Sequence, residues 1–222
     1  MTDTMTTTTT PELTTAPTPQ VIVNRGTGAG GAQTNGNGLA WEERTSNERN
    51  LAEKFGFTRT SLGAGKTMYY LCKRFENVQV VFTTQHGLKK ILKDSHDVTL
   101  GWNPDEAYII QKNGKTVLKI LEKKHQNTAG SVDTKLLAGP MIRDSYKITV
   151  PSDWDVEYAF CVNNYFRNNV FNNDRKHIQK LLAEQNIPIF YGEDADYFEK
   201  LNSWIGLPPH EEHVRTSSPP TH

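Results

Sequence analysis

The sequence has few cysteines, no long apolar run and no net charge, and each shortage excludes a class of protein. Its two cysteines, Cys72 and Cys161, lack CxxC or zinc-finger spacing, so we expect free thiols in a reducing compartment rather than a disulfide framework. No stretch of about 18 apolar residues predicts a membrane span, and the N-terminus lacks the basic and apolar regions of a signal peptide. We therefore expect a soluble intracellular protein, cytoplasmic or nuclear and not secreted, with no membrane partner.

The chain also has no overall field that would attract a polyanion. Lys and Arg number 25, as do Asp and Glu, so the formal net charge is +0 and any attraction to nucleic acid must come from a local patch. From Gln111 to Lys147 there are eight basic and three acidic residues. This excess predicts phosphate contacts there, although a solvated positive face is the competing interpretation of each residue. The candidates are Lys112, Lys115, Lys119, Lys123, Lys135, Arg143 and Lys147.

Length and composition favour one domain between two tails. A chain of 222 residues fits one domain better than two. Residues 1–40 hold twelve threonines and six glycines but only three charged residues, a composition typical of a disordered tail. The Pro-rich residues 207–222 are predicted to be a second disordered tail, which leaves residues 41–206 for the folded domain.

The hydrophobic pattern between the tails predicts both strands and helices. We expect strands where β-branched and aromatic residues cluster, at residues 67–73, 78–83, 98–102, 156–162 and 187–191. We expect helices where apolar residues recur at helical spacing, at residues 41–55, 85–94, from about 131, around 178–182 and at 197–205. The predicted fold class is therefore α/β, with a central mixed β-sheet flanked by helices.

The clearest local signal is a β-hairpin whose turn is Asn113-Gly114. Apolar runs at residues 106–110 and 116–121 flank this pair, which is typical of a two-residue type I′ turn. Stepping outward from the turn, one residue at a time on each strand, brings Asp105 opposite Glu122. Lys124 lies on the same face because side chains alternate with a period of two. A slip of one residue in the turn would break this opposition.

One end of the hairpin is thus predicted to display two carboxylates and an ammonium on one face. Opposed carboxylates repel each other, but a divalent cation between them reverses the sign of the interaction. Hard oxygen ligands suit Mg²⁺, which polarises a phosphodiester and helps to ionise a water, and a neighbouring lysine can orient that water. The alternative is a solvated hairpin whose charges only keep it soluble.

Pro104-Asp105 followed by Glu122-Lys123-Lys124 resembles the signature of the PD-(D/E)XK nuclease superfamily, which includes many type II restriction endonucleases. The resemblance covers about residues 85–162 and extends to the order helix, three strands, helix and strand. It implies a restriction-endonuclease-like core and a Mg²⁺-dependent phosphodiester hydrolase, with Mn²⁺ as a substitute ion. It also implies that Asp105 and Glu122 are catalytic metal ligands and that Lys124 is the catalytic residue that orients the water.

Three further roles stay open at this point. Members of this superfamily often have one more acid from an upstream helix, and the candidates are Glu76, Asp94 and Asp97. Gln126 would share the face of Glu122 if the strand continued that far, as a weak nucleic-acid contact; a loop residue is the alternative. After the predicted 156–162 strand, a polar group either reads base edges or belongs to a turn: Asn163, Asn164, Arg167, Asn168 and Asn169.

The expected function is that of a site-specific, restriction-like endonuclease acting on double-stranded DNA. A homodimer is expected by analogy, because a duplex has two strands to cut. Two alternatives are kept: a structure-selective, repair or RNA nuclease, and a catalytically inactive nucleic-acid-binding protein of the same fold. Binding of Mg²⁺ or Mn²⁺ at Asp105 separates an enzyme from an inactive binder.

Overall fold

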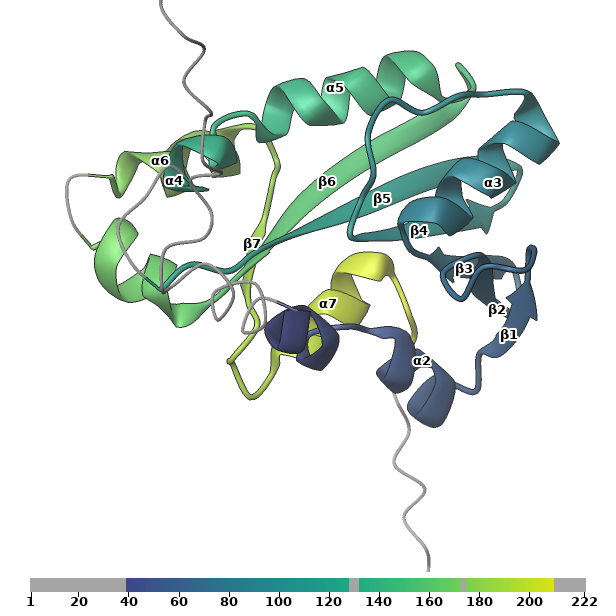
Figure 1. The fold of residues 1–222 in the computed structure, drawn as a ribbon, viewed down its shortest axis with the longest axis horizontal. Helices are drawn as coiled ribbons and strands as arrows, with labels where there is room; N and C mark the ends of the chain where they lie inside the picture. The colour runs from purple at the N-terminus through teal and green to yellow at the C-terminus, as the bar shows by residue number, and fades with distance from the viewer. Residues whose placement is uncertain (1–38, 128–131, 173–174, 210–222) are drawn as a thin grey trace, which may run out of the picture. The chain divides into compact units, whose positions relative to one another are not determined.

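The structure is a computed structural model that describes residues 39–127, 132–172 and 175–209 (Figure 1). Almost all of the two predicted tails, residues 1–40 and 207–222, lies outside the described residues. A helical segment covers residues 39–44, and Leu207 is buried against the core. The folded unit therefore includes residues just beyond both expected domain boundaries.

A seven-stranded mixed sheet forms the centre of this unit, which confirms the expected α/β class. The strands follow one another in chain order across the sheet. β1 to β5 pair antiparallel, whereas β5, β6 and β7 pair parallel. The strands are β1 Thr58–Ser61, β2 Tyr69–Phe75, β3 Val78–Thr83, β4 Glu106–Lys112, β5 Lys115–Lys124, β6 Trp154–Val162 and β7 Ile189–Tyr191.

Helices cover both faces of the sheet, and each face has its own apolar core. One core packs α3 (Gln85–His96), α4 (Val132–Leu136), α5 (Gly139–Thr149) and α6 (His177–Glu184) against the strands. The other packs the 39–44 segment, α2 (Glu48–Phe55) and α7 (Tyr197–Ile205) against the opposite face. Figure 1 shows α5 running along β6 on one side of the sheet, with α2 and α7 on the other side.

The β4–β5 hairpin has the predicted register. Asn113 and Gly114 have φ angles of 50° and 76°, and a type I′ turn requires two such positive values. Lys112 pairs with Lys115, and the ladder continues without interruption to Glu106 opposite Leu121. One further step places Asp105 opposite Glu122. Leu118 and Ile120 belong to the α3–α5 core and Leu121 to the other core, so Glu122 and Lys124 share the α3–α5 face.

Two expected elements differ from the structure. Residues 98–102 are not a strand, because Asp97 ends α3 in the left-handed conformation with φ 55° and Leu100 is then drawn into the core. The strand next to β4 is β3, which precedes α3. The helix expected over 41–55 is interrupted at residues 45–47, where the backbone N–H of Asn47 bonds to the Glu106 side chain at 3.1 Å.

The sequence pattern gives no sign of two other elements. The four residues of β1 are all exposed, so they lack the alternation that identifies a half-buried strand. A short π-helix, Phe166–Val170, follows β6. None of the helices within the described residues has the length and apolar character needed to cross a bilayer.

Candidate active site

Asp105 and Glu122 lie close together at the open end of the β4–β5 hairpin. Asp105 precedes β4, and its Oδ2 accepts a hydrogen bond of 2.7 Å from the backbone N–H of Lys123 on the facing strand. Burial raises the pKa of Asp105, and that hydrogen bond acts in the opposite direction. Burial, and then the negative charge of Asp105, raise the pKa of Glu122. A raised pKa means that the ionised form of each carboxyl is less favourable in the folded protein than in water. The pair by itself therefore does not stabilise the fold.

Lys124 completes the group of three that the sequence predicts. Its Nζ forms an ion pair with Oε1 of Glu122, and the two side chains are 22% and 21% exposed. Its positive charge also lowers the pKa values of Asp105 and Glu122, against the effect of burial. The structure therefore brings Asp105, Glu122 and Lys124 together in a place that solvent still reaches.

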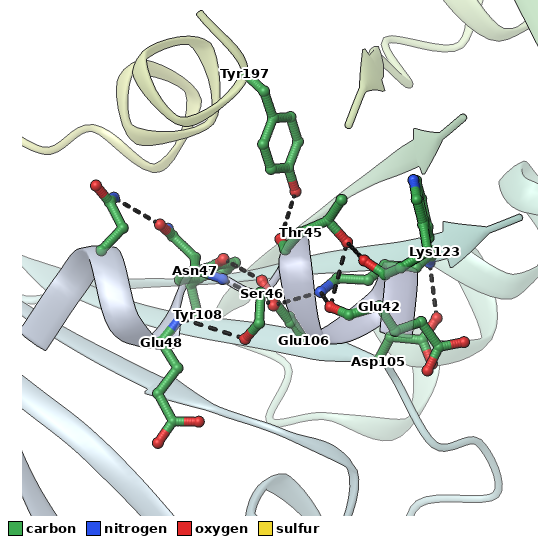
Figure 2. A network of polar contacts seen from close by, with 12 residues as sticks. Glu42, Thr45, Ser46, Asn47, Glu48, Asp105, Glu106, Tyr108, Lys123 and Tyr197 are labelled. Carbon is green, nitrogen blue, oxygen red and sulfur yellow. Dashed lines mark hydrogen bonds and ion pairs between the residues drawn. The ribbon is translucent and has the colours of Figure 1, made fainter. Parts of the chain in front are cut away.

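A third acid near this pair is Glu42, which sequence reasoning missed. Burial and then the charge of Asp105 raise the pKa of Glu42, and Figure 2 shows the two side chains next to each other. The three acids proposed from the sequence lie elsewhere. Glu76 is in the turn between β2 and β3, at the far end of the strands, and Asp94 and Asp97 are exposed in ion pairs with lysines of α3. Glu42 was missed because only the folded chain brings the 39–44 helix to β4.

Two tyrosines, Tyr146 of α5 and Tyr158 of β6, complete the surroundings of the acidic pair on the α3–α5 face. They are 2% and 0% exposed. Burial and then the charge of Glu122 raise the pKa of each, and both side chains belong to the core on that face. The sequence contains no signal for them, because their position depends on how β6 pairs with β5.

The reverse face of the hairpin carries a buried polar network (Figure 2). Lys123 Nζ lies 2.8 Å from Oε1 of Glu106, and the two side chains are 3% and 2% exposed. Nζ also donates to the carbonyl of Glu42 at 2.9 Å, and the Tyr108 hydroxyl donates to Oε2 of Glu106 at 2.6 Å. The prediction that Lys123 contacts phosphate is therefore wrong: its side chain lies on the opposite side of β5 from Lys124, is almost fully buried and is paired with Glu106.

For Gln126 and Asn163 the structure favours the structural alternative over a contact with nucleic acid. β5 ends at Lys124, so Gln126 is a loop residue, and it is buried. The Gln126 N–H donates to Oδ1 of Asn163 at 3.2 Å, and Nδ2 of Asn163 donates to the Gln126 carbonyl at 2.8 Å. Asn163 thus joins the ends of two strands, and neither residue offers a surface to nucleic acid.

The remaining basic candidates are spread over the surface. Lys112 and Lys115 are exposed at the hairpin tip, seven residues from Asp105 along β4, or about 23 Å at the rise of a strand. Lys135 is exposed on α4. Arg143 is only partly exposed, and it donates to the carbonyl of Gln185 at 2.7 Å. Lys112, Lys115, Lys135 and Arg143 stay predictions as phosphate contacts, and the length of the hairpin puts Lys112 and Lys115 at a different phosphate from Asp105.

A cleft of about 980 Å³ opens beside Asp105. Its lining comes mostly from residues 42–54, together with the start of β4 and the start of α3. Glu42 and Asp105 both line it, whereas Glu122 and Lys124 lie outside its lining. The cleft gives Asp105 access to solvent from the α2 side of the sheet.

The donor set at the hairpin end fits one kind of metal ion. Within the described ranges, no three or more His, Cys, Asp and Glu side chains gather closely enough to hold a metal by themselves. Mg²⁺ does not need such a cage, because it takes one or two carboxylates and fills its other positions with water and substrate phosphate oxygens. Asp105 and Glu122 supply those two carboxylates. A structural zinc ion does not fit, since it requires four ligands, mainly nitrogen and sulfur.

The sequence matches no protein-family model, and a search of curated proteins finds no match. A distant structural likeness exists to the crystal structure of an XisH family protein from Nostoc punctiforme PCC 73102. The sequences are 11% identical, the TM-score is 0.33, and the alignment covers 68% of this chain and 88% of that chain. At this TM-score the likeness supports no inference on family or activity, so the functional assignment depends on the geometry of the site.

Proposed function

We propose that the protein is a Mg²⁺-dependent endonuclease that hydrolyses phosphodiester bonds of double-stranded DNA in a restriction-like, site-specific manner. One observation carries the proposal: Asp105 and Glu122 oppose each other on one face of the hairpin end, with Lys124 one pair-step beyond. The α/β fold, with its central mixed sheet, is compatible with the restriction-endonuclease-like core that the sequence resembles.

Each residue of the site has a separate task in this proposal. Asp105 and Glu122 would hold the cation, and the Lys123 N–H holds the Asp105 carboxylate in position at 2.7 Å. A bound Mg²⁺ would supply polarisation of the phosphodiester and would offset the charge that develops on it. Lys124 exchanges its contact with Glu122 for one with the attacking water, which it orients, and its positive charge stabilises the transition state. Mn²⁺ is expected to replace Mg²⁺.

The cost of the arrangement argues for an enzyme over an inactive binding protein. Burial and mutual repulsion act against Asp105 and Glu122 when both are ionised. A protein that only binds a phosphate backbone needs positive charge at the contact, and two facing carboxylates oppose such binding. The pair becomes favourable only when a cation lies between the two carboxylates. This unfavourable arrangement therefore supports cation binding and hydrolysis as the function.

The test uses the full-length protein and a mixture of plasmids in Mg²⁺ buffer. Wild type is compared with Glu122→Gln, with a chelator control, and with Glu157→Gln as a matched control. Glu157 is a half-buried glutamate on neighbouring β6 that pairs with Lys119, away from the site. Discrete fragments are expected from wild type and Glu157→Gln but not from Glu122→Gln or in chelator.

Other outcomes select among the alternatives. A smear that requires Mg²⁺ and Glu122 identifies a nonspecific or repair nuclease. Cleavage of RNA alone would move the substrate to RNA. A gel shift of DNA without cleavage of DNA or RNA contradicts the enzyme and favours the binding protein.

A further inference from the structure

The side chain of Tyr158 has an unmet hydrogen-bonding need within the candidate active site. The residue is 0% exposed, and its hydroxyl has no hydrogen-bond partner in the structure. A buried hydroxyl without a partner lowers stability, whereas a phenylalanine would fill the same space at no such cost. We therefore look for an acceptor that the hydroxyl could reach in another state of the site.

The strand register shows where that acceptor lies. β5 and β6 are parallel, with Ile120 opposite Tyr158 and Glu122 opposite Phe160. Tyr158 and Glu122 thus project from the same face and are diagonal neighbours, a separation that an aromatic side chain can span. The Tyr158 ring packs edge-on against Phe160, with 5.2 Å between centroids, so it has little freedom to turn elsewhere.

In this structure Glu122 is paired with Lys124 and not with the Tyr158 hydroxyl. Lys124 contacts Oε1 of Glu122, so the carboxylate is drawn toward the ammonium. A cation between Asp105 and Glu122 would take over the role of Lys124 as the positive charge on Glu122. Carboxylates that bind metals are usually held in turn by a hydrogen bond from a second residue, and Tyr158 offers a buried donor for it.

We propose that Tyr158 is a positioning residue, whose hydroxyl donates a hydrogen bond to Oε2 of Glu122 when a divalent cation binds that carboxylate. This inference rests on the proposed function. The bond fixes the orientation of the ligand and releases Lys124 toward the water. No covalent bond changes in this step: one hydrogen bond forms as one ion pair separates.

Tyr158→Phe is the variant that tests the proposal, because it removes the hydroxyl and keeps the packing of the ring. Mn²⁺ binding to the full-length protein is measured by electron paramagnetic resonance, beside thermal unfolding without metal. We expect the affinity for Mn²⁺ to fall about 10- to 100-fold, while the metal-free Tm stays the same or rises. A residue with a purely structural role would not separate the two readouts in this way.

Tyr108→Phe is the matched control. Tyr108 is also a fully buried tyrosine, on neighbouring β4, but its hydroxyl donates to Glu106 on the reverse face. This variant should have a lower Tm without metal than wild type, and its affinity for Mn²⁺ should be unchanged. A tyrosine ultraviolet difference spectrum on addition of Mg²⁺ gives a second readout, expected in wild type and Tyr108→Phe and lost in Tyr158→Phe.

The outcomes distinguish this inference from the proposed function. If Tyr158→Phe binds Mn²⁺ as tightly as wild type, the role of Tyr158 is wrong and the metal site stands. If wild type binds no Mn²⁺, the metal site itself is wrong and the role of Tyr158 falls with it.

Discussion

Glu106 and Lys123 form an ion pair, 2.8 Å between Oε1 and Nζ, directly behind the two carboxylates of the candidate site. Glu106 follows Asp105 in the chain and Lys123 follows Glu122, so each site residue has a neighbour that points to the other face of the sheet. Glu106 also accepts hydrogen bonds from the Asn47 N–H and the Tyr108 hydroxyl. The buried pair thus fixes the hairpin end and the N-terminal helices that together surround Asp105.

Removal of one partner of this pair should destabilise the protein strongly. Lys123→Met leaves the Glu106 carboxylate buried without its counter-charge, which typically costs about 3–5 kcal/mol. Urea unfolding measures the loss. Lys115→Met at the exposed hairpin tip is the control and should change stability by less than about 0.5 kcal/mol. Wild-type stability in Lys123→Met would contradict the buried pair and restore Lys123 as a surface contact.

The acidic pair should cost the protein stability at neutral pH, and this cost should fall as the pH is lowered. Burial raises the pKa of Asp105, and burial with repulsion from Asp105 raises that of Glu122. A carboxyl with a raised pKa binds its proton more tightly in the folded chain. Its contribution is complete below the ordinary values, 3.8 and 4.5, and is lost as the pH rises through the folded pKa.

Asp105→Asn should therefore be more stable than wild type at neutral pH in chelator. A Tm rise of about 2–4 °C is expected for a gain of about 1 kcal/mol, and the difference should shrink as the pH falls. Thermal melts across this pH range provide the measurement, with exposed Asp155→Asn as the control. A difference that is constant with pH would show that Asp105 carries no excess charge cost.

Much of the site was predictable because it depends on a short-range turn. Asn113 and Gly114 fix the register of the β4–β5 hairpin, and the period of two then places Asp105, Glu122 and Lys124 on one face. The same alternation assigns Lys123 to the opposite face. Its burial could therefore have been predicted from the sequence on the assumption that helices cover both faces of the sheet.

The missed residues depend on contacts between distant parts of the chain. Glu42 approaches Asp105 only because the 39–44 helix packs on the sheet, and Tyr158 approaches Glu122 only because β6 pairs parallel to β5. Residues 98–102 have the β-branched composition of a strand. The left-handed turn at Asp97 and the burial of Leu100 override that local preference.

Lys124→Met should separate cation binding from hydrolysis. Loss of the ammonium removes the group that orients the water, so the cleavage rate should fall about 100-fold or more. Affinity for Mn²⁺ should stay the same or rise, because Lys124 no longer competes for Glu122. Plasmid cleavage and Mn²⁺ titration measure the two effects, with Lys115→Met as the control. Cleavage at the wild-type rate would show that Lys124 has no role in the chemistry.

Asn163 should act as a structural joint between β5 and β6 rather than as a reader of bases. Its side chain bonds to both the N–H and the carbonyl of Gln126, at 3.2 and 2.8 Å, in the manner of a further strand pair beyond Lys124 and Val162. Asn163→Ala leaves the buried Gln126 backbone groups without these bonds, which should cost about 1–3 kcal/mol in urea unfolding.

The control for this prediction is the exposed Asn168→Ala, which should change stability by less than about 0.5 kcal/mol. At a temperature where Asn163→Ala is still folded, it should cut DNA at the same positions as wild type, because Asn163 is 5% exposed and its amide already bonds to Gln126 and Asn127. A new cleavage pattern together with wild-type stability would reverse the assignment, since only a residue that contacts bases could alter the sequence preference and leave the fold unaffected.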